Sequence, residues 1–493
     1  MKQKVLIWVV VVWGWLCAQE SDLWADITLS KLFTDHMVIQ QNEPVRIWGT
    51  GDPQATIVVT FRDHESEAIV GADGKWATVI QSGGPGGPHK LEVRTADGQK
   101  KIVLSDVLVG EVWICSGQSN MEWRVADAAH ADREMELSKE FAAVRLFTVE
   151  PRAETEPHDE FGRVRGWDVC GPDTVGSFSA VAYVFGRHLQ QRLKVPVGLI
   201  NVSLGGTRAE AWTSRAALEK DSAFEPLLRH WDQVSDLTSV HRPGNLYNGM
   251  IAPLRGCSFR GVIWYQGESN VGRGEQYARL FPALIQNWRQ DLAAGEPCPF
   301  YFVQIAPFRY EGRDAEELPE LWDAQLKSLR SVPETGMVVT TDISELNDIH
   351  PSNKQDVGRR LALWALAHGY RESLSQNGSE EEIVPSGPLY REMVIEGNRI
   401  RIRFDYAQDE LVAGGDGPLT EFTICGADQK FVPAQAQVDG SDVIVWSDDI
   451  AEPKAVRFGW RDTAQPNLFN RAGLPASPFR TDDYDLLSAG RSY

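Results

Sequence analysis

Hydrophobic and polar positions follow a strand pattern in the first part of the chain. From about residue 27 to 104, short runs rich in apolar and β-branched residues alternate with turn signals. The runs are Val45–Trp48, Ala55–Phe61, Trp76–Ile80 and Lys90–Thr95. Glycine and proline crowd residues 83–88, which is typical of a loop. Short strands with regular turns predict an N-terminal β-sandwich domain over residues 25–105.

The pattern changes between residues 106 and 372. Apolar runs that predict buried strands now alternate with stretches that place apolar residues at helical spacing, such as 180–193 and 276–288. The strand runs are Val112–Cys115, Val197–Val202, Gly261–Tyr265, Phe300–Ile305 and Met337–Thr341. This alternation predicts an α/β domain whose parallel sheet carries helices on both faces.

Helical patterning stops after Tyr370. Residues 399–404 alternate strictly between arginine and an apolar side chain, and further strand patterns lie at Asp442–Trp446 and Ala455–Trp460. The last part of the chain, residues 373–493, is therefore predicted to be an all-β segment.

The N-terminus has the pattern of a secretory signal. Two lysines precede the uncharged apolar run Val5–Cys17, which is too short for a comfortable membrane span. We predict a signal peptide over residues 1–18, cleaved after Ala18, and export to the periplasm or the extracellular space. An uncleaved anchor and a lipoprotein site at Cys17 are the alternatives.

Composition and charge narrow the range of partners. The chain is 42% hydrophobic and 24% charged, as expected of a globular protein, and its formal net charge of -20 becomes -22 without Lys2 and Lys4. An acidic chain repels phosphate backbones, so nucleic acid is not an expected partner. No stable membrane insertion is expected after cleavage of the signal. The oligomeric state stays open.

Cysteine spacing gives no metal site. Apart from Cys17, the cysteines stand at positions 115, 170, 257, 298 and 425, far from one another in sequence. This spacing lacks the close pairs of a zinc site, and an odd number leaves at least one thiol free even in an oxidising compartment.

Polar clusters follow four of the predicted strands. They are Ser116–Asn120, Ser203–Thr207, Gln266–Asn270, and Asp342 together with Asp348–Pro351. Because ligands bind at the carboxyl ends of the strands in open α/β sheets, we expect these clusters to converge on one site.

The clusters supply the parts that acyl transfer needs. Ser119 is the candidate nucleophile, and His350 is the candidate base that would take its proton. Asp348 is the nearest acid that could orient the histidine, with Asp342 in reserve. The backbone N–H groups of Ser119 and of Gly205 or Gly206, with the amide of Gln266, are the expected oxyanion donors.

Other interpretations exist for each residue taken alone. Ser119 could cap the helix that we expect from Asn120 to Val125 and beyond, and Asp348 could cap the helix expected over residues 353–368. The Gly205–Gly206 pair could be a simple turn. Glu268 could be a glycosidase carboxylate, but no partner at a suitable spacing is evident. The joint occurrence of the residues favours an esterase.

Together the motifs resemble the sialate O-acetylesterase family, a carbohydrate-esterase branch of the SGNH hydrolases. The motifs are Gly117–Met121, Gly205–Thr207, Trp264–Asn270 and Asp348–Pro351, with further similarity at Lys31–Val38, Asn467–Asn470 and Leu474–Asp482. The resemblance implies a three-layer α/β/α catalytic domain flanked by β domains. It also implies hydrolysis of O-acetyl esters on sugars by Ser119 and His350, without metal or organic cofactor.

The resemblance leaves the acid and the substrate open. Many SGNH enzymes carry the acid three residues before the histidine, where this chain has Asn347, and Asp348 stands two before it. The expected partner is an acetylated sugar or glycan, sialic acid first, with acetylated xylan or another plant polysaccharide as the alternative. An inactive carbohydrate-binding protein is the alternative of another class. Candidate substrate contacts are Arg208, Glu210, Trp212, Glu268 and Asn270.

Overall fold

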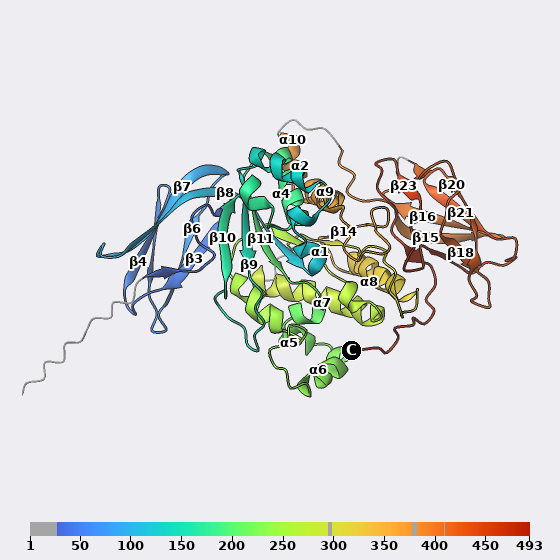
Figure 1. Cartoon of the computed structure of the whole chain (residues 1–493), viewed down its shortest axis with the longest axis horizontal. Coiled ribbons are helices and arrows are strands. Elements are labelled where there is room, and N and C mark those ends of the chain that lie inside the picture. The colour runs from blue at the N-terminus through green and yellow to red at the C-terminus, as the bar shows by residue number, and fades with distance from the viewer. Residues whose placement is uncertain (1–26, 294–297, 377–381, 409) are drawn as a thin grey trace, which may run out of the picture.

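Three parts of the chain lie in a row in the computed structural model, which describes residues 27–293, 298–376, 382–408 and 410–493. A β part at the N-terminus, a central part of helices and strands, and a β part near the C-terminus follow one another (Figure 1). The predicted α/β class is confirmed. The predicted signal peptide, residues 1–18, lies outside the described residues.

The central sheet has the strand order β10-β9-β11-β8-β12-β13-β14. All these neighbours pair in parallel except β10 and β9. The five predicted strand runs lie in this sheet, whereas β9 and β10 at one edge were not predicted. The bounds are β8 (Lys101–Gly117), β9 (Val144–Val149), β10 (Val164–Val169), β11 (Val197–Ser203), β12 (Gly261–Tyr265), β13 (Phe300–Val303) and β14 (Thr335–Val338).

Helices cover both faces of this sheet. Every residue of β11, β12 and β13 is buried, which requires cover on both sides because successive side chains point to opposite faces. On one face, Trp264 and Phe302 pack against Phe281 of α7. On the other, Gly336 of β14 approaches Trp364 of α9. The four main helices are α4 (Ala180–Leu193), α7 (Gly274–Leu292), α8 (Glu317–Ser331) and α9 (Lys354–Trp364).

Shorter helices lie in the connections. They are α1 (Ser119–Glu122), α2 (Ala131–Leu137), α3 (Pro172–Val175), α5 (Arg215–Leu218), α6 (Glu225–Asp232) and α10 (Arg371–Gln376). Within the described ranges, no helix is both long and apolar enough to cross a bilayer.

The N-terminal part holds two sheets, and one long strand joins it to the central sheet. β8 pairs with β7 up to Val109 and with β11 from Glu111 onward, so the predicted boundary at 105/106 falls inside a strand. Asp106 marks a kink there, with φ 55° and its carboxylate 2.7 Å from Arg145 Nη1. The other strands are β1 (Thr28–Leu29), β2 (Val38–Gln40), β3 (Pro44–Thr50), β4 (Thr56–Phe61), β5 (His64–Ile69), β6 (Lys75–Gln81) and β7 (Gly86–Thr95).

The C-terminal part consists of small antiparallel sheets. β16 buries Ile400, Ile402 and Phe404 and turns its arginines outward, as the strict alternation predicts. The strands are β15 (Leu389–Glu396), β16 (Arg399–Asp405), β17 (Leu411–Ala413), β18 (Phe422–Cys425), β19 (Val432–Pro433), β20 (Gln435–Asp439), β21 (Asp442–Trp446), β22 (Ala455–Phe458), β23 (Leu468–Asn470) and β24 (Phe479–Arg480).

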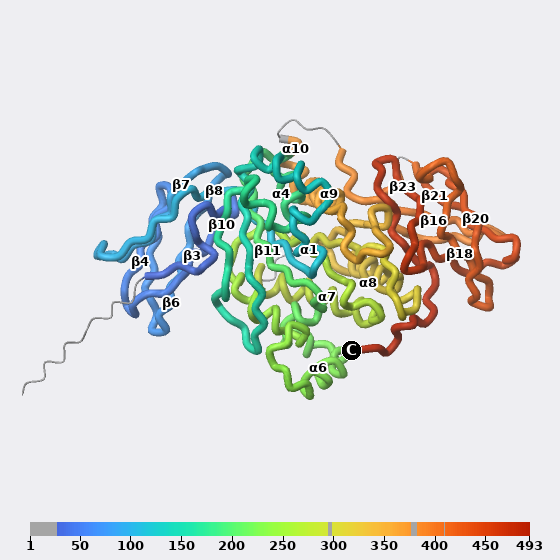
Figure 2. Tube along the Cα trace, viewed as in Figure 1, coloured from blue at the N-terminus to red at the C-terminus, as the bar shows by residue number. Residues whose placement is uncertain are grey.

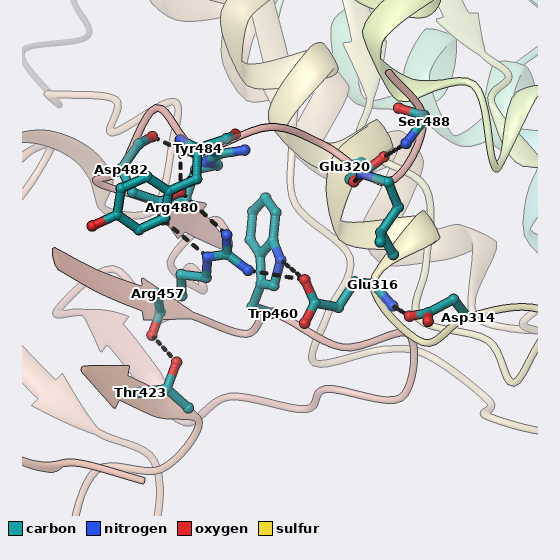
Figure 3. A network of polar contacts seen from close by, with 11 residues as sticks. Asp314, Glu316, Glu320, Thr423, Arg457, Trp460, Arg480, Asp482, Tyr484 and Ser488 are labelled. Carbon is teal, nitrogen blue, oxygen red and sulfur yellow. Dashed lines mark hydrogen bonds and ion pairs between the residues drawn. The ribbon is translucent and has the colours of Figure 1, made fainter. Parts of the chain in front are cut away.

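Charged contacts dock this part onto α8. Arg457 donates to Glu316 and to Asp482, each at 2.9 Å, and Trp460 Nε1 donates to the same Glu316 (Figure 3). The chain then returns along the central part, where Glu320 accepts the Ser488 N–H at 3.0 Å. Figure 2 shows this last segment ending beside α6. The C-terminus therefore fastens the third part to the second.

All five described cysteines are free thiols. The odd count predicted at least one. Burial raises the pKa of Cys115, which lies in the core of the central sheet.

Candidate active site

Ser119 follows the strand at the centre of the sheet. Between Glu111 and Met121 it is the one residue that is not buried. Gly117, two residues earlier, has φ +143° and lies so close to β12 that a Cβ there would be 2.1 Å from the carbonyl oxygen of Tyr265. Only glycine fits this position, and its close approach brings the chain out of the sheet at Ser119.

The helix after Ser119 is much shorter than predicted. α1 is a single turn that ends at Glu122, and Gln118 is its N-cap residue. Ser119 is therefore not the cap, and a one-turn helix gives little macrodipole to stabilise an anion. Its backbone N–H belongs to the first turn and makes no hydrogen bond within the described part of the chain.

The structure brings Ser119 and His350 together from opposite ends of the central part. His350 lies in the loop between β14 and α9, and its Nε2 is 2.9 Å from Ser119 Oγ. The imidazole stacks on the indole of Trp123, with ring centroids 4.7 Å apart and an interplanar angle of 17°. A histidine nitrogen at hydrogen-bond distance can accept the serine proton.

The two candidate acids differ sharply. Asp348 Oδ1 is 3.9 Å from His350 Nδ1 and accepts the backbone N–H of His350 at 2.8 Å, while its side chain is 56% exposed. Asp342 is occupied elsewhere, because both of its oxygens accept from Arg360, at 2.7 and 2.6 Å. Asp348 is thus the acid beside the histidine, but its carboxylate is exposed to solvent and only distantly in contact with the imidazole ring.

The surroundings of His350 favour its neutral form. Burial lowers its pKa below the ordinary value, and the nearby Lys354 lowers it further, whereas Asp348 acts in the opposite direction. A neutral imidazole is the form that can take up a proton.

The glycine loop after β11 lies against the serine. A Cβ on Gly205 would be 3.3 Å from Ser119 Cβ. The Gly205 N–H donates to Glu122 Oε2 at 2.7 Å, so this expected oxyanion donor is already engaged. The N–H of Gly206, which has φ +71°, makes no hydrogen bond among the described residues.

Gln266 does not offer the donor that was expected of it. Its amide nitrogen donates to Asn270 Oδ1 at 2.7 Å and to the Thr207 carbonyl at 3.2 Å, and its amide oxygen accepts from Tyr277. The side chain is fully buried. Because both amide hydrogens are used, Gln266 ties the glycine loop to the loop after β12.

Three of the five expected substrate contacts lie in the core. Asn270, Trp212 and Glu210 are fully buried, so these expectations are corrected. Glu210 binds Arg273 at 2.9 Å and accepts from Asn270 at 2.9 Å. A side chain without exposed surface cannot touch a substrate. These three side chains therefore support the conformation of the loops from the core.

The remaining two expected substrate contacts are Arg208 and Glu268. Arg208 is half-buried and makes no hydrogen bond or ion pair with any described residue. Glu268 accepts from Asn120 through Oε1, while its buried Oε2 has no partner. Burial raises the pKa of Glu268.

Sequence reasoning missed Lys354, and it gave Asn120 no role although that residue lies in the predicted Ser119 cluster. Lys354 lies on the buried face of α9 with Val357 and Leu361, and its Nζ donates to Asn120 Oδ1 at 2.6 Å. The spacing i, i+3, i+7 was visible in the sequence as a lysine in register with an apolar helix face. Within the described ranges, no group of three or more histidine, cysteine, aspartate or glutamate side chains could hold a metal ion.

Comparisons with known proteins agree on one family. Residues 109–367 match the sequence model of the family described as "Carbohydrate esterase, sialic acid-specific acetylesterase". Sialate O-acetylesterase of Homo sapiens is 30% identical over 505 residues, which cover 93% of this chain and 94% of that protein. The Mus musculus enzyme of the same name is 28% identical over 512 residues, covering 91% and 93%.

A solved structure is similar over nearly the whole chain. The crystal structure of a carbohydrate acetylesterase from Xanthomonas citri has a TM-score of 0.84 and 36% identity, and the match covers 93% of this chain and all (100%) of that one.

Fold and site first define a class. A serine hydroxyl that meets a histidine nitrogen at the carboxyl edge of a parallel sheet is the arrangement of a serine ester hydrolase. The chain belongs to the sialic acid-specific acetylesterase family of carbohydrate esterases, and the resemblance seen in the sequence is confirmed.

Proposed function

We propose that the chain hydrolyses O-acetyl esters on sugars, sialic acid first among them, with Ser119 as nucleophile and His350 as base. The observation that carries this proposal is the 2.9 Å contact between Ser119 Oγ and His350 Nε2. The catalytic part is proposed to be of the SGNH type, a three-layer α/β/α domain over residues 106–372 between two β domains.

The proposed reaction has two steps. Ser119 Oγ attacks the acetyl carbonyl carbon while His350 Nε2 takes the hydroxyl proton. The bond from the carbonyl carbon to the sugar oxygen breaks, and His350 returns the proton to that oxygen. Water then attacks the carbonyl carbon of the acetyl-serine while His350 Nε2 takes one of its protons. The bond from that carbon to Ser119 Oγ breaks, His350 returns the proton to Oγ, and the acetyl group leaves as acetic acid, which ionises to acetate. His350 is the acid or the base in every proton transfer of these two steps.

The N–H groups of Ser119 and Gly206 are the proposed oxyanion donors. Both are free among the described residues, whereas Gly205 is held by Glu122. Glu122 thereby keeps the glycine loop against the serine. Loss of one such donor typically raises the barrier by about 2.7–4 kcal/mol.

Arg208 is the proposed substrate contact that favours an acidic sugar. It follows the glycine loop, is half-buried, and makes no hydrogen bond or ion pair with the described residues. The nearby carboxylate of Glu210 is already bound to Arg273. A guanidinium without a contacting carboxylate suits the carboxylate of a sialic acid better than it suits a neutral xylan.

One comparison tests the function and its substrate. Acetate release is measured from O-acetylated sialic acid and from acetylated xylan, with wild type and Arg208→Gln. The proposal expects faster release from sialic acid and a raised KM for that substrate alone in the variant. Faster release from xylan would establish the plant-polysaccharide alternative.

A labelling experiment addresses the inactive alternative. A fluorophosphonate probe reacts with an activated serine. We expect labelling of wild type at Ser119; an unlabelled protein that still binds the glycan would be a carbohydrate-binding protein without activity.

Export is proposed from the N-terminal pattern of residues 1–18. The check is the N-terminal sequence of the protein recovered outside the cytoplasm, which should begin at Gln19. Recovery of the full-length chain from the cytoplasm would contradict the proposal.

A further inference from the structure

A buried lysine lies behind the catalytic pair. Lys354 is 1% exposed, in the first turn of α9, and its ammonium group is 5.7 Å from the ring centroid of Trp123 and 5.8 Å from that of Tyr265. A lysine is rarely buried so fully without a carboxylate in contact. No acidic oxygen of the described residues lies within ion-pair distance of its Nζ.

Its hydrogen bonds lead to both sides of the site. Lys354 Nζ donates to Asn120 Oδ1 at 2.6 Å and to the carbonyl oxygen of Pro351 at 2.7 Å. Asn120 is the neighbour of Ser119, and Pro351 is the neighbour of His350. The lysine therefore connects the backbone segments that carry the two reacting groups.

Asn120 completes the connection. Its amide nitrogen donates to the Ile349 carbonyl at 2.9 Å and to Glu268 Oε1 at 2.5 Å. The carbonyls on either side of His350, those of Ile349 and Pro351, are thus both held by the pair of Asn120 and Lys354. Two fixed peptide groups leave the histidine backbone little freedom to shift relative to Ser119.

The acid cannot provide such a hold on the ring. Asp348 is exposed, and its oxygen is 3.9 Å from His350 Nδ1, beyond hydrogen-bond distance. Instead, the ring of His350 stacks on Trp123, and the backbone of His350 is fixed by Asn120 and Lys354.

We propose that Lys354, acting through Asn120 and the Pro351 carbonyl, is the positioning residue that holds His350 against Ser119. This inference rests on the proposed function of these two residues. Lys354 touches no reacting atom; it fixes the distance over which the proton moves, and its charge disfavours a second positive charge on the imidazole.

Several charged groups face this lysine. Glu268 is linked to Lys354 by the Asn120 side chain. Asp348 and Glu345 lie in the loop before α9. His350 is the neighbouring group that titrates. Burial lowers the pKa of Lys354 to about 7, while the three carboxylates act to raise it. Below that pH the lysine is charged, and its charge lowers the pKa of His350.

The test separates positioning from folding. Lys354→Met keeps most of the apolar stem but removes the charge and the hydrogen-bond donor. We expect kcat to fall about 10²-fold with KM nearly unchanged, because a small misplacement of a reacting group has that cost. The acid limb of the kcat/KM profile should move to higher pH. Lys354→Arg, which keeps the charge, should leave the acid limb in place.

A second variant keeps the proposal testable if Lys354→Met does not fold. Asn120→Ala removes the link to the Ile349 carbonyl but leaves the lysine charge. It should lower kcat without moving the acid limb upward.

Arg289→Met is the matched control. Arg289 is also a buried cation whose hydrogen bonds go to backbone carbonyls, those of Cys298 and Glu334, but none of them lies beside Ser119 or His350. It should lower the melting temperature and leave kcat of the folded enzyme unchanged.

Two results would overturn the proposal. One is a folded Lys354→Met enzyme with wild-type kcat and pH profile; the other is a loss of kcat no larger than that of Arg289→Met. If Ser119→Ala were as active as wild type, the proposed function itself would fail, which keeps the two failures distinct.

Discussion

A catalytic histidine must present one nitrogen to the nucleophile and must not turn away from it. In this site the ring of His350 stacks on Trp123, and the carbonyls on both sides of the residue are held by Asn120 and Lys354. The acid of a typical triad holds the ring by a direct hydrogen bond to Nδ1, which here is only a long contact with Asp348. In the proposed mechanism, packing on Trp123 and the backbone contacts therefore orient His350 more than the acid does.

The first residue-scale prediction concerns Asp348. Because its carboxylate is exposed and 3.9 Å from Nδ1, we expect Asp348→Asn to lower kcat by about 10-fold, far less than the roughly 10⁴-fold loss seen where the acid is buried and bonded. Steady-state kinetics check this. A loss of three orders of magnitude or more would show that the contact tightens into a true triad when substrate binds.

The second residue-scale prediction is the pH dependence of kcat/KM. Burial and Lys354 lower the pKa of His350, so the neutral, basic form persists to lower pH. The acid limb of kcat/KM should therefore lie below the ordinary imidazole value of about 6.5. A profile of kcat/KM against pH measures it, and an acid limb above that value would contradict the expected direction.

The site residues could be predicted from the sequence where a reactive side chain follows the end of a predicted strand. Ser119 and His350 stand in polar loops after apolar strands, and that placement alone suggested their meeting. Gln266 and Trp212 stand in equally polar loops, yet they are buried. Which side of a loop faces the core depends on contacts between segments far apart in sequence, and no local pattern reports it.

At the scale of elements, the buried parallel strands were easy to predict, except β9, which is nearly fully buried and pairs in parallel with β11 but was missed. They appear as short apolar runs because both faces are covered, as in β11 and β12. β10 at the edge escaped prediction because it mixes exposed and buried positions without regular alternation. α1 was predicted too long, since the pattern after Ser119 does not reveal that the chain leaves the helix at Trp123.

The element-scale prediction concerns Gly117, where β8 meets β12. Gly117→Ala forces both an unfavourable φ and a contact of 2.1 Å with the Tyr265 carbonyl oxygen. We expect a loss of stability of about 3 kcal/mol or more and little activity. Denaturant unfolding measures it, with Gly98→Ala as control.

Gly98 also has a positive φ, of +72°, but nothing lies within 4 Å of its added Cβ. Its substitution should cost only about 1 kcal/mol. Equal losses in the two variants would mean that the close approach of the strands does not matter.

At the scale of the whole molecule, the parts share structure rather than meeting at simple linkers. β8 runs through the predicted boundary at 105/106, because composition changes there while the strand continues past the kink at Asp106. The contacts of the C-terminal tail with α8 could not be predicted either, since they join residues more than a hundred positions apart.

The prediction at this scale concerns Asp482, whose side chain is fully buried between Arg457 and Arg480 (Figure 3). Asp482→Asn leaves two buried guanidinium groups without this counterion, so we expect a stability loss of about 3–5 kcal/mol. Calorimetry should show it, with kcat of the folded enzyme unchanged at low temperature. Asp483→Asn, at the exposed neighbouring position, is the control and should melt like wild type.

The central claim is that Ser119 carries the acetyl group during hydrolysis. The most direct measurement is mass spectrometry of the protein quenched during turnover of p-nitrophenyl acetate. We predict a gain of one acetyl group on the peptide that contains Ser119, and no such gain in Ser119→Ala, which should also release almost no acetate from an acetylated sugar. An acetyl group on another residue, or a Ser119→Ala protein that keeps most of its activity, would contradict the account.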